Sequence, residues 1–511
     1  MGEIVRAAAL ALLVSAGNTA SAEPVTREQV LEALPTLEVL ARKMIEDGEV
    51  PGLSIAIVYK DEVVYLKGFG LREAGKPDAV DEDTVFQIAS LSKPVSSTVV
   101  AALVGEGILG WDSRVSDLDP AFALKDPYPT QQVTVRDFFN HRSGLPGSAG
   151  DDLEDIGFDR ETVMHRLRLV PPSSSFRAGY AYSNSGITEG ALAAVKPTGK
   201  SWEDIAEEKL YGPLGMTSTS SRYADFLARA NRSELHIGSV GNWVAKIKRD
   251  PTVQAPAGGV SGSARDLAKW MRLELGSGMF DGKQLISAEA LAATHVPLMA
   301  RGNNPVTSAA SFYGLGWNVE FGRHGLSWGH AGAFSVGGRT LVTLYPDAEF
   351  GILVLANAFP TGVPEGLGDS FADLVFTGSV EKDWTKDWNA AYASLFGPAV
   401  EAAKQTFGTK PSPASPALPA ASYTGSYAND YVGVATVTAE GEQLTLKVGP
   451  DGKTVYPMAH FDRDVFLIYP DPEMPDTPSP VTFSIGPGGK AVAITIENLN
   501  SNGLGVLDRL P

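Results

Sequence analysis

Two serine–lysine pairs have the spacing that a lysine-activated nucleophile requires. Ser90 and Lys93 open a stretch of small and apolar residues, 91–104, that is typical of a buried helix. Residues three apart on a helix share a face, so the Lys93 amine would lie beside the Ser90 hydroxyl, and the unpaired N–H groups of the helix start would face an anionic intermediate. The other pair, Ser379 and Lys382, follows a helical stretch and precedes charged residues, which indicates a helix end. Ser90 is therefore the stronger candidate for a nucleophile.

A third serine pattern, Gly325-Leu326-Ser327-Trp328-Gly329, matches the nucleophile elbow of another class of hydrolases. An elbow needs a strand before the serine and a helix after it, followed by an acid and a histidine. Here residues 331–340 are glycine-rich and lead into a strand, and the later histidines in the sequence are His330 and His460. This context does not fit an elbow.

Two further motifs follow Ser90 along the chain. Tyr182-Ser183-Asn184 lies in a loop of small residues before an apolar helix predicted at 187–195, and His330-Ala331-Gly332 lies beside a predicted strand. A second Tyr-x-Asn pattern, Tyr427-Ala428-Asn429, has no helical pattern behind it. Because short patterns recur by chance, the order of the motifs is more informative than any one of them.

Residues 31–374 resemble the penicillin-recognising serine hydrolases, in the branch of class C β-lactamases, D-alanyl-D-alanine carboxypeptidases, D-aminopeptidases and related esterases. The three elements of that family are Ser-x-x-Lys, Tyr-x-Asn and a Lys-Thr-Gly or His-x-Gly on a strand. Ser90/Lys93, Tyr182/Asn184 and His330/Gly332 match them in order. Further stretches that look like landmarks of the family are Asn140–Leu145, Pro213–Met216, Ala257–Gly259, Ser263–Leu267 and Tyr313–Trp317.

The resemblance implies an acyl-enzyme mechanism on Ser90, with Lys93 and Tyr182 as general base and acid. Lysine can act as a base only when it is neutral, which requires burial or a nearby cation, and a Tyr182 phenolate is the alternative base. The sequence leaves both alternatives open. Asn184 would hydrogen-bond the substrate amide or orient Lys93, and the backbone N–H groups of Ser90 and Ala333 would form the oxyanion hole.

His330 departs from the Lys-Thr-Gly of the true β-lactamases, a tripeptide that occurs nowhere in the sequence. Imidazole is only partly cationic near neutral pH, so it would hold a substrate carboxylate weakly. This favours esterase, amidase or peptidase activity. One alternative is a class C-like β-lactamase, and another is a non-catalytic protein that binds cell-wall peptide or polymer on the same fold. Gly332 is expected to let a substrate chain approach the strand edge, and His141 is interpreted as structural.

These residues need a sheet and a buried helix to position them. Helical patterns dominate from 90 to 276, and strand patterns flank them on both sides. We therefore expect a mixed α/β (α+β) fold, in which an antiparallel sheet is assembled from both ends of the domain, flanked by helices and interrupted by a helical insertion. The strands are predicted at 52–59, 63–66, 314–321, 340–345 and 350–356, and two of the helices at 133–140 and 263–275.

Composition divides the chain into four parts. Residues 1–22 combine Arg6, an apolar run and Ala20-Ser21-Ala22, which predicts a signal peptide cleaved near Ala22 and a bacterial periplasmic or secreted protein. The hydrolase domain is expected at 23–407 and a Pro-rich linker at 408–421. Alternating short runs at 422–511 predict a small all-β domain, sandwich or barrel, which resembles the lipocalin-like accessory domain of some family members. We expect it to shape access to the cleft or to hold a homo-oligomer together.

The charge balance and the absence of cysteine exclude several functions. A net charge of −18 repels a phosphate backbone, so no nucleic-acid partner is expected. With no cysteine the chain has no thiolate nucleophile and no disulfide. Scattered histidines predict no metal and no cofactor, and no segment after the signal peptide is apolar enough to span a bilayer. The expected partner is a small-molecule or short-peptide substrate.

Overall fold

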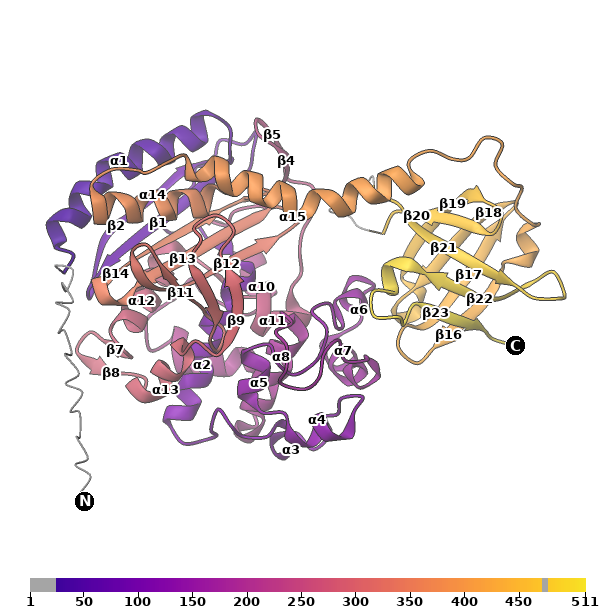
Figure 1. Ribbon diagram of the computed structural model, residues 1–511, viewed down its shortest axis with the longest axis horizontal. Helices are drawn as coiled ribbons and strands as arrows, with labels where there is room; N and C mark the ends of the chain where they lie inside the picture. Colours follow the sequence, from indigo (N-terminus) through magenta and orange to yellow (C-terminus); the bar gives the residue numbers. More distant parts are fainter. Residues whose placement is uncertain (1–23, 471–476) are drawn as a thin grey trace, which may run out of the picture.

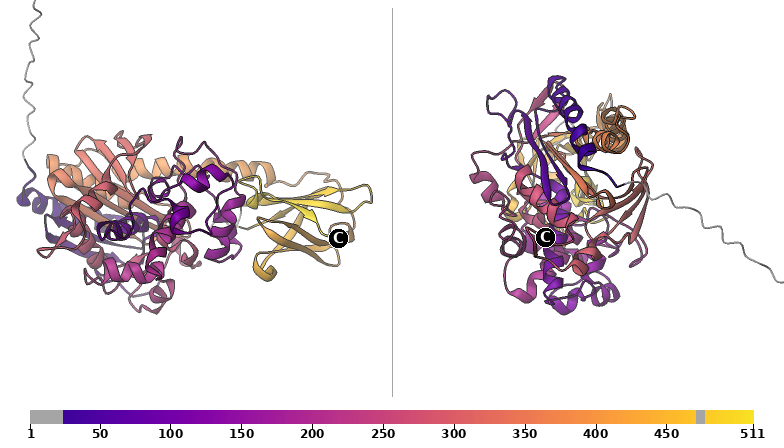
Figure 2. Two further views of the ribbon diagram at one scale, coloured as in Figure 1. Left: turned by 90° about the horizontal axis from the view of Figure 1, so that it is seen from below. Right: turned by 90° about the vertical axis from the view of Figure 1, so that its left-hand side faces the viewer.

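A computed structural model describes residues 24–470 and 477–511 of the chain. The predicted signal peptide lies outside these residues. An eight-stranded sheet, a helical region on one of its faces and a separate C-terminal barrel make up the described structure (Figure 1). Viewed from below, the barrel lies beside the larger unit along the long axis, and in the end view it lies behind that unit (Figure 2).

The sheet is antiparallel throughout and joins both ends of the larger unit. The first strand, which is apolar and buried along its whole length, pairs with the last one, so that Leu53 lies opposite Ala356 and Tyr59 opposite Phe350. This confirms the expected sheet built from the two ends of the chain segment. In sheet order the strands are β2 (Glu62–Gly70), β1 (Gly52–Tyr59), β14 (Phe350–Ala356), β13 (Gly338–Tyr345), β12 (Gly325–Phe334), β11 (Asn318–Gly322), β10 (Ala310–Tyr313) and β9 (Met299–Asn303).

The predicted strand at 314–321 is wrong in its first half. Residues Gly314 to Trp317 form a turn between β10 and β11, closed by a hydrogen bond from Gly314 N to Trp317 O. Gly316 has a φ of +81°, and a Cβ there would lie 2.8 Å from the carbonyl oxygen of Lys93. The close approach to the segment that carries Lys93 therefore requires both the turn and its glycine.

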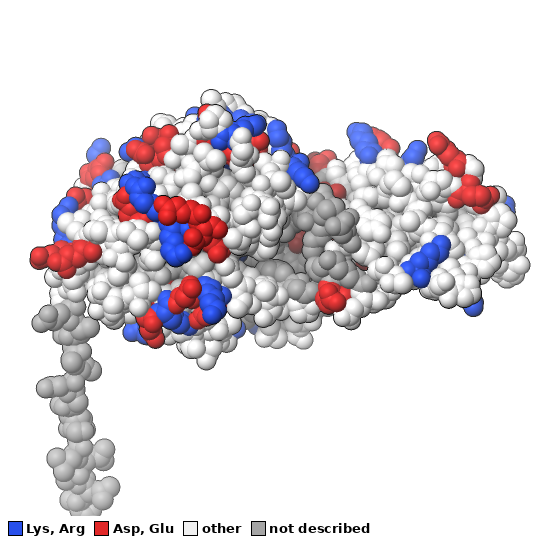
Figure 3. Space-filling model, turned by 90° about the horizontal axis from the view of Figure 1, so that it is seen from above, with Lys and Arg blue, Asp and Glu red and all other residues white. Residues whose placement is uncertain are grey.

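Helices cover the two faces of the sheet. Three of them, from the two ends of the larger unit, lie together on one face, and the inserted helical region lies on the other (Figure 1). On the outer surface seen in Figure 3, Lys and Arg side chains are interspersed with Asp and Glu, so this face carries no patch of a single sign. The helices of the first face are α1 (Arg27–Glu46), α14 (Val363–Thr377) and α15 (Trp384–Phe407).

The inserted region contains one almost completely buried helix, α2 (Ser92–Gly105). Its serines are bound to neighbouring backbone: the Ser96 hydroxyl donates to Pro256 O over 2.6 Å, and the Ser92 hydroxyl accepts from Val260 N over 2.9 Å. These bonds satisfy polar groups that burial would otherwise leave unpaired. Other helices on this side of the sheet include α5 (Val135–Phe139), α6 (Asp151–Asp155), α7 (Arg160–Arg166), α8 (Asn184–Val195), α11 (Ala255–Gly258) and α12 (Ala264–Leu275).

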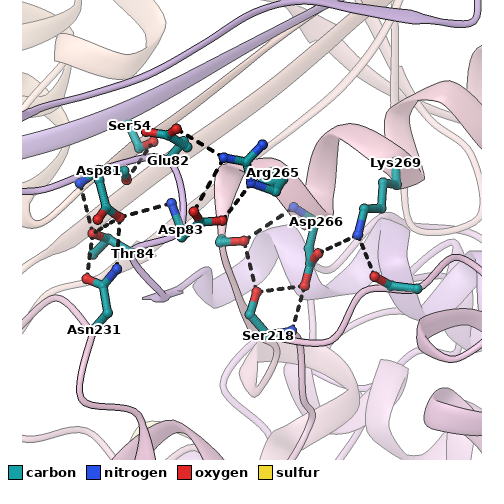
Figure 4. Close-up of polar contacts among 12 residues, drawn as sticks. Ser54, Asp81, Glu82, Asp83, Thr84, Ser218, Asn231, Arg265, Asp266 and Lys269 are labelled. Carbon is teal, nitrogen blue, oxygen red and sulfur yellow. Dashed lines mark hydrogen bonds and ion pairs between the residues drawn. The ribbon is translucent and has the colours of Figure 1, made fainter.

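A polar network fixes the segment that leads to Ser90 (Figure 4). Arg265 of α12 forms ion pairs with Asp83 at 2.6 Å and Glu82 at 3.0 Å, and Asn231 donates to Asp81 over 2.8 Å. Just beyond this loop, β3 (Phe86–Gln87) pairs with β6 (Ser261–Gly262). The entry to the segment that carries Ser90 is therefore held by side chains on one side and a short strand pairing on the other.

The C-terminal part is a closed barrel of eight antiparallel strands, which confirms the expected all-β region. It touches the helical region at α6 and α7. The Tyr431 hydroxyl donates to Asp152 Oδ1 over 2.6 Å, and Arg166 Nη1 donates to Tyr431 O over 2.6 Å. The strands are β16 (Gly425–Asn429), β17 (Gly433–Glu440), β18 (Gln443–Val448), β19 (Thr454–Asp462), β20 (Val465–Ile468), β21 (Ser479–Ile485), β22 (Ala491–Ile496) and β23 (Val506–Arg509).

Candidate active site

Ser90 lies in a 3₁₀ turn, Ala89–Leu91, immediately before α2. The preceding residue, Ala89, has a φ of +50°, a left-handed conformation that is uncommon for a residue with a side chain. Ser90 itself is partly exposed, whereas its neighbours on both sides are buried. A hydroxyl at such a turn is presented to the surface of the molecule while its backbone stays fixed.

Lys93 lies one turn further along and points back to Ser90. Its Nζ is 3.0 Å from Ser90 Oγ, 2.7 Å from Asn184 Oδ1 and 3.0 Å from the carbonyl oxygen of Ala257. The side chain is completely buried. Burial lowers the pKa of Lys93 to about 7, and the negative charge of Asp151 opposes this effect.

Tyr182 and Asn184 reach the same place from the start of α8. The Ser183 hydroxyl caps this helix by accepting from Gly186 N, and the backbone N–H of Ser183 donates to His141 Nδ1 over 3.0 Å. The His141 ring also packs against Tyr182 at 4.6 Å between centroids. His141, which has a φ of +60°, therefore holds the loop of the Tyr-x-Asn motif in place, consistent with its structural interpretation.

The Tyr182 ring lies 4.5 Å from Lys93 Nζ, measured to the ring centroid. Burial raises the pKa of the Tyr182 hydroxyl, and a hydrogen bond with Ser90 only partly offsets this. A phenolate is therefore disfavoured, and of the two bases that the sequence left open the buried amine is the one poised near neutral pH.

His330 lies on β12 and is buried and neutral. Its Nδ1 lies 2.7 Å from the carbonyl oxygen of Ala331, which can only accept, so Nδ1 carries the proton and Nε2 accepts from the Tyr313 hydroxyl at 3.0 Å. Burial lowers the pKa of His330 well below its usual value. The ring is thus engaged on both nitrogens and supplies no positive charge to a substrate carboxylate.

Gly332 is required for a different reason from the one expected. A Cβ at this position would lie 2.2 Å from the carbonyl oxygen of Ile88 and 2.5 Å from Thr340 Oγ1. The space beside this glycine is filled by the segment that leads to Ser90, not left open for a substrate. The glycine lets β12 pack directly against the turn that carries Ser90.

A cleft of about 620 Å³ contains Ser90, Asn184 and Ala333 together in its lining. One wall comes from the C-terminal barrel through Tyr456 and Leu499. Ser90 thus opens into a space that the two parts of the molecule form jointly. Its size suits a small molecule or a short peptide.

The competing motifs lie elsewhere in the fold. Ser327 is near the start of β12, which is followed by another strand and not by a helix, and Ser379 lies in the segment after α14. The Tyr427 hydroxyl is buried in the barrel, where it donates to Tyr423 O over 2.5 Å. Sequence reasoning missed Asp151 and Gln254, which line the cleft. The acidic run 151–155 was the available signal, but an acidic run is more often a solvated surface.

A metal centre or a membrane span would need its own set of residues within the described ranges 24–470 and 477–511. In this part of the chain no three His, Asp or Glu side chains come together in a way that could hold a metal ion. The helices described there lack the combination of length and apolar character that crossing a membrane requires.

Comparison with known proteins agrees with this arrangement. The beta-lactamase family model matches residues 37–375, and a domain of unknown function, DUF3471, matches residues 409–504. An unguisins hydrolase of Aspergillus campestris is 27% identical over 478 residues, which is 88% of this chain and 86% of the relative. Penicillin-binding protein 4 of Amycolatopsis lactamdurans is 28% identical over 323 residues, which is 60% of this chain and 81% of that protein.

A solved structure extends the likeness of the fold to most of the chain. The octameric penicillin-binding protein homologue from Pyrococcus abyssi superposes with a TM-score of 0.56 at 19% identity, and the match covers 91% of this chain and 98% of that one. At this identity the likeness concerns the fold alone. The match of the family model over most of the larger unit shows that the chain belongs to the beta-lactamase family of serine β-lactamase-like and penicillin-binding-protein-like hydrolases.

Proposed function

We propose that the protein is a serine hydrolase that cleaves amide, peptide or ester bonds through an acyl-enzyme on Ser90. The observation that carries this proposal is the position of the buried Lys93 amine, 3.0 Å from Ser90 Oγ, with a pKa lowered to about 7. A base is most effective when its pKa lies near the working pH. Asn184 acts as a positioning residue, because its Oδ1 accepts a hydrogen bond from Lys93.

In the first half of the reaction, neutral Lys93 takes the proton of the Ser90 hydroxyl while Oγ forms a bond to the substrate carbonyl carbon. The carbonyl oxygen becomes negative and is bound by the N–H groups proposed for the oxyanion hole, those of Ser90 and Ala333. Collapse of this intermediate breaks the bond to the leaving group, which takes a proton from Tyr182. Tyr182 recovers a proton from protonated Lys93, leaving the acyl ester and a neutral amine.

In the second half, water replaces the leaving group and the steps run in reverse. Water loses a proton to the Lys93–Tyr182 pair as its oxygen bonds to the acyl carbon, and Ser90 leaves with a proton. One water is consumed for each bond cleaved. Burial keeps the Tyr182 hydroxyl protonated, so it has a proton to transfer to the leaving group.

The two alternatives fit less well. A class C-like β-lactamase needs a cation for the carboxylate of its substrate, and His330 is neutral with both ring nitrogens engaged. A non-catalytic binding protein has no need of a lysine whose burial lowers the pKa to about 7. At a binding surface, a solvent-exposed charged lysine would cost less free energy than a buried one.

The remaining proposals concern the whole chain. We propose a signal peptide at 1–22 with export to the periplasm or exterior, a hydrolase domain at 23–407, a linker at 408–421 and an accessory domain at 422–511. The match of a separate domain model to residues 409–504 supports the last division. A homo-oligomer is also proposed, since the similar structure from Pyrococcus abyssi is octameric.

Hydrolysis of p-nitrophenyl acetate by the full chain and by Ser90→Ala tests the proposal. We expect Ser90→Ala to lose at least a thousandfold in kcat/KM, and a fluorophosphonate to add one adduct to the wild type and none to the variant. Ser327→Ala, a serine of the competing motif, serves as the matched control and should keep its adduct. Unchanged turnover in Ser90→Ala would refute the assignment.

A further inference from the structure

The cleft that contains Ser90 has more acidic than basic side chains in its lining. Lys248 and Arg249 are the basic residues of the described lining, and Arg249 is already paired with Glu154 at 2.9 Å. Lys248 is exposed. The acidic members of the lining are Asp151, Asp152, Glu154, Asp155 and Asp250. The lining therefore holds more acidic than basic groups, and a cation bound there would favour the charged form of these acids.

Asp151 is the acid most directly connected to the reacting groups. It opens α6, and its Oδ1 accepts from the buried Gln254 amide over 2.7 Å, a bond that orients the carboxyl group, while burial raises its pKa to about 7. Its charge acts on Lys93, which places it within electrostatic reach of the Ser90–Lys93 pair. Among the described residues no lysine or arginine forms an ion pair with it.

Asp152 adds a second carboxylate without a cation. Only 7% of this residue is exposed, and its Oδ1 accepts from the Tyr431 hydroxyl of the barrel over 2.6 Å. Its Oδ2 is buried and has no hydrogen-bond partner among the described residues. A buried carboxylate oxygen without a donor costs free energy unless a ligand or a solvent molecule supplies the donor.

Cations that could bind a substrate carboxylate are scarce in this cleft. Arg301, whose charge acts on Tyr182 and His330, is not part of the cleft lining, and its guanidinium donates to Asn318 Oδ1 and lies over the Tyr180 ring. His330 is neutral and engaged on both nitrogens, and the free cation of the cleft lining, Lys248, is on the exposed rim. Repulsion by the acidic lining adds to this, because like charges in a partly desolvated cleft cost more than in water. The cleft therefore favours positively charged over negatively charged substrates.

We propose that this cleft selects substrates that carry an ammonium group close to the scissile carbonyl, with the carboxylates of Asp151 and Asp152 as the complementary charge. This rests on the proposed hydrolase function and narrows its substrate class. It also gives the barrel a role in specificity, because Tyr431 orients Asp152 and Tyr456 contributes to the wall of the same cleft. Substrates with a carboxylate in that position are disfavoured.

Two matched substrate pairs test the proposal with the full wild-type chain. For charge on the acyl side, alanine p-nitroanilide of either configuration is compared with its N-acetyl and N-succinyl derivatives. For charge on the leaving-group side, acetylcholine is compared with 3,3-dimethylbutyl acetate, which has the same shape without the charge. We expect kcat/KM to be at least tenfold higher for the cationic member in one of the two series, and the advantage to shrink as salt is added. The succinyl derivative should be the poorest.

Variants assign the preference to its residues. Asp151→Asn and Asp152→Asn should each reduce the ratio of kcat/KM between the cationic and the neutral substrate by at least threefold. Asp117→Asn, an exposed acid on α3 (Val115–Leu118), is the matched control and should leave the ratio unchanged. If either cleft variant fails to fold, the ratio of kcat/KM between cationic and neutral substrates in the wild type still tests the proposal.

The outcomes separate this proposal from the one on which it rests. If the wild type shows no hydrolysis of p-nitrophenyl acetate that depends on Ser90, the proposed hydrolase function itself is contradicted. If that hydrolysis is present and neither series prefers the cation, the ammonium proposal is overturned while the hydrolase stands. If the anilides are turned over too slowly to measure, the same compounds are tested as inhibitors of p-nitrophenyl acetate hydrolysis. Equal inhibition by the charged and the neutral forms in both series would also overturn the ammonium proposal.

Discussion

The buried amine of Lys93 predicts how the rate depends on pH. Its pKa falls from an ordinary 10.5 to about 7 because the side chain is completely buried. A displacement of this size corresponds to roughly 5 kcal/mol in favour of the neutral over the charged amine. At pH 7 about half of the molecules would carry a neutral Lys93, against about one in 3,000 for a solvated lysine.

The sign follows from the role of the amine. Only the neutral form takes a proton from Ser90, so kcat/KM for p-nitrophenyl acetate should fall about tenfold per pH unit well below 7 and reach a plateau well above it. Measurements from pH 5 to 9 at constant ionic strength, with the Ser90→Ala rate subtracted, would show this limb. His141 and His330 do not compete for its assignment, because burial lowers the pKa of both well below the usual range.

Asp151 could produce a limb in the same window, because burial raises the pKa of its carboxyl to about 7. Asp151→Asn separates the two groups. The negative charge of Asp151 raises the pKa of Lys93, so its removal should keep the limb and move it to lower pH. A rate that is independent of pH between 5 and 9, a midpoint above 9, or loss of the limb in Asp151→Asn would each refute the assignment to Lys93.

Two further predictions concern the supports of the site. Gly332→Ala places a Cβ 2.2 Å from Ile88 O and should destabilise the protein by about 1–3 kcal/mol, seen as a lower Tm together with reduced turnover, whereas Gly488→Ala, which has open space around it, should have little effect. Equal melting temperatures would contradict the packing of β12 against the turn that carries Ser90. Tyr431→Phe removes the donor to Asp152 and should increase hydrogen exchange or proteolysis at the barrel contact by several-fold, with the exposed Tyr469→Phe as control. Identical protection in the two variants would show that this bond does not hold the barrel.

Sequence reasoning reached the sheet and the segment that carries Ser90 because their signals are local. The apolar run at β1 and the small residues of α2 are readable without knowledge of contacts, and the order of Ser90, Tyr182 and His330 indicates a shared site. The sequence pattern predicts a strand through Gly316 where the structure has a turn, because the residue that packs against this turn, Lys93, lies 223 positions earlier in the chain. Long-range packing of this kind has no local pattern.

The same limit explains the residues of the cleft that were missed. Asp151 and Asp152 lie in an acidic run that in isolation indicates solvated surface. Their importance arises only when Gln254 and the barrel residue Tyr431 contact them. Likewise, the neutral state of His330 follows from its position between Tyr313 and the backbone of Ala331, and the sequence alone could indicate only a reduced charge.

The charge of Asp151 links the base to the proposed substrate. In the free protein this carboxylate opposes the effect of burial and favours the protonated, inactive form of Lys93. An ammonium group bound at Asp151 would neutralise that influence and add a positive charge of its own near the amine, and both changes lower the pKa of Lys93. Binding of a cationic substrate would thus increase the fraction of neutral base at the moment when Ser90 needs it, whereas a neutral substrate leaves Asp151 to hold the proton on the amine. The acidic lining would then contribute to turnover as well as to binding, because the complementary charge acts on the base that starts the reaction.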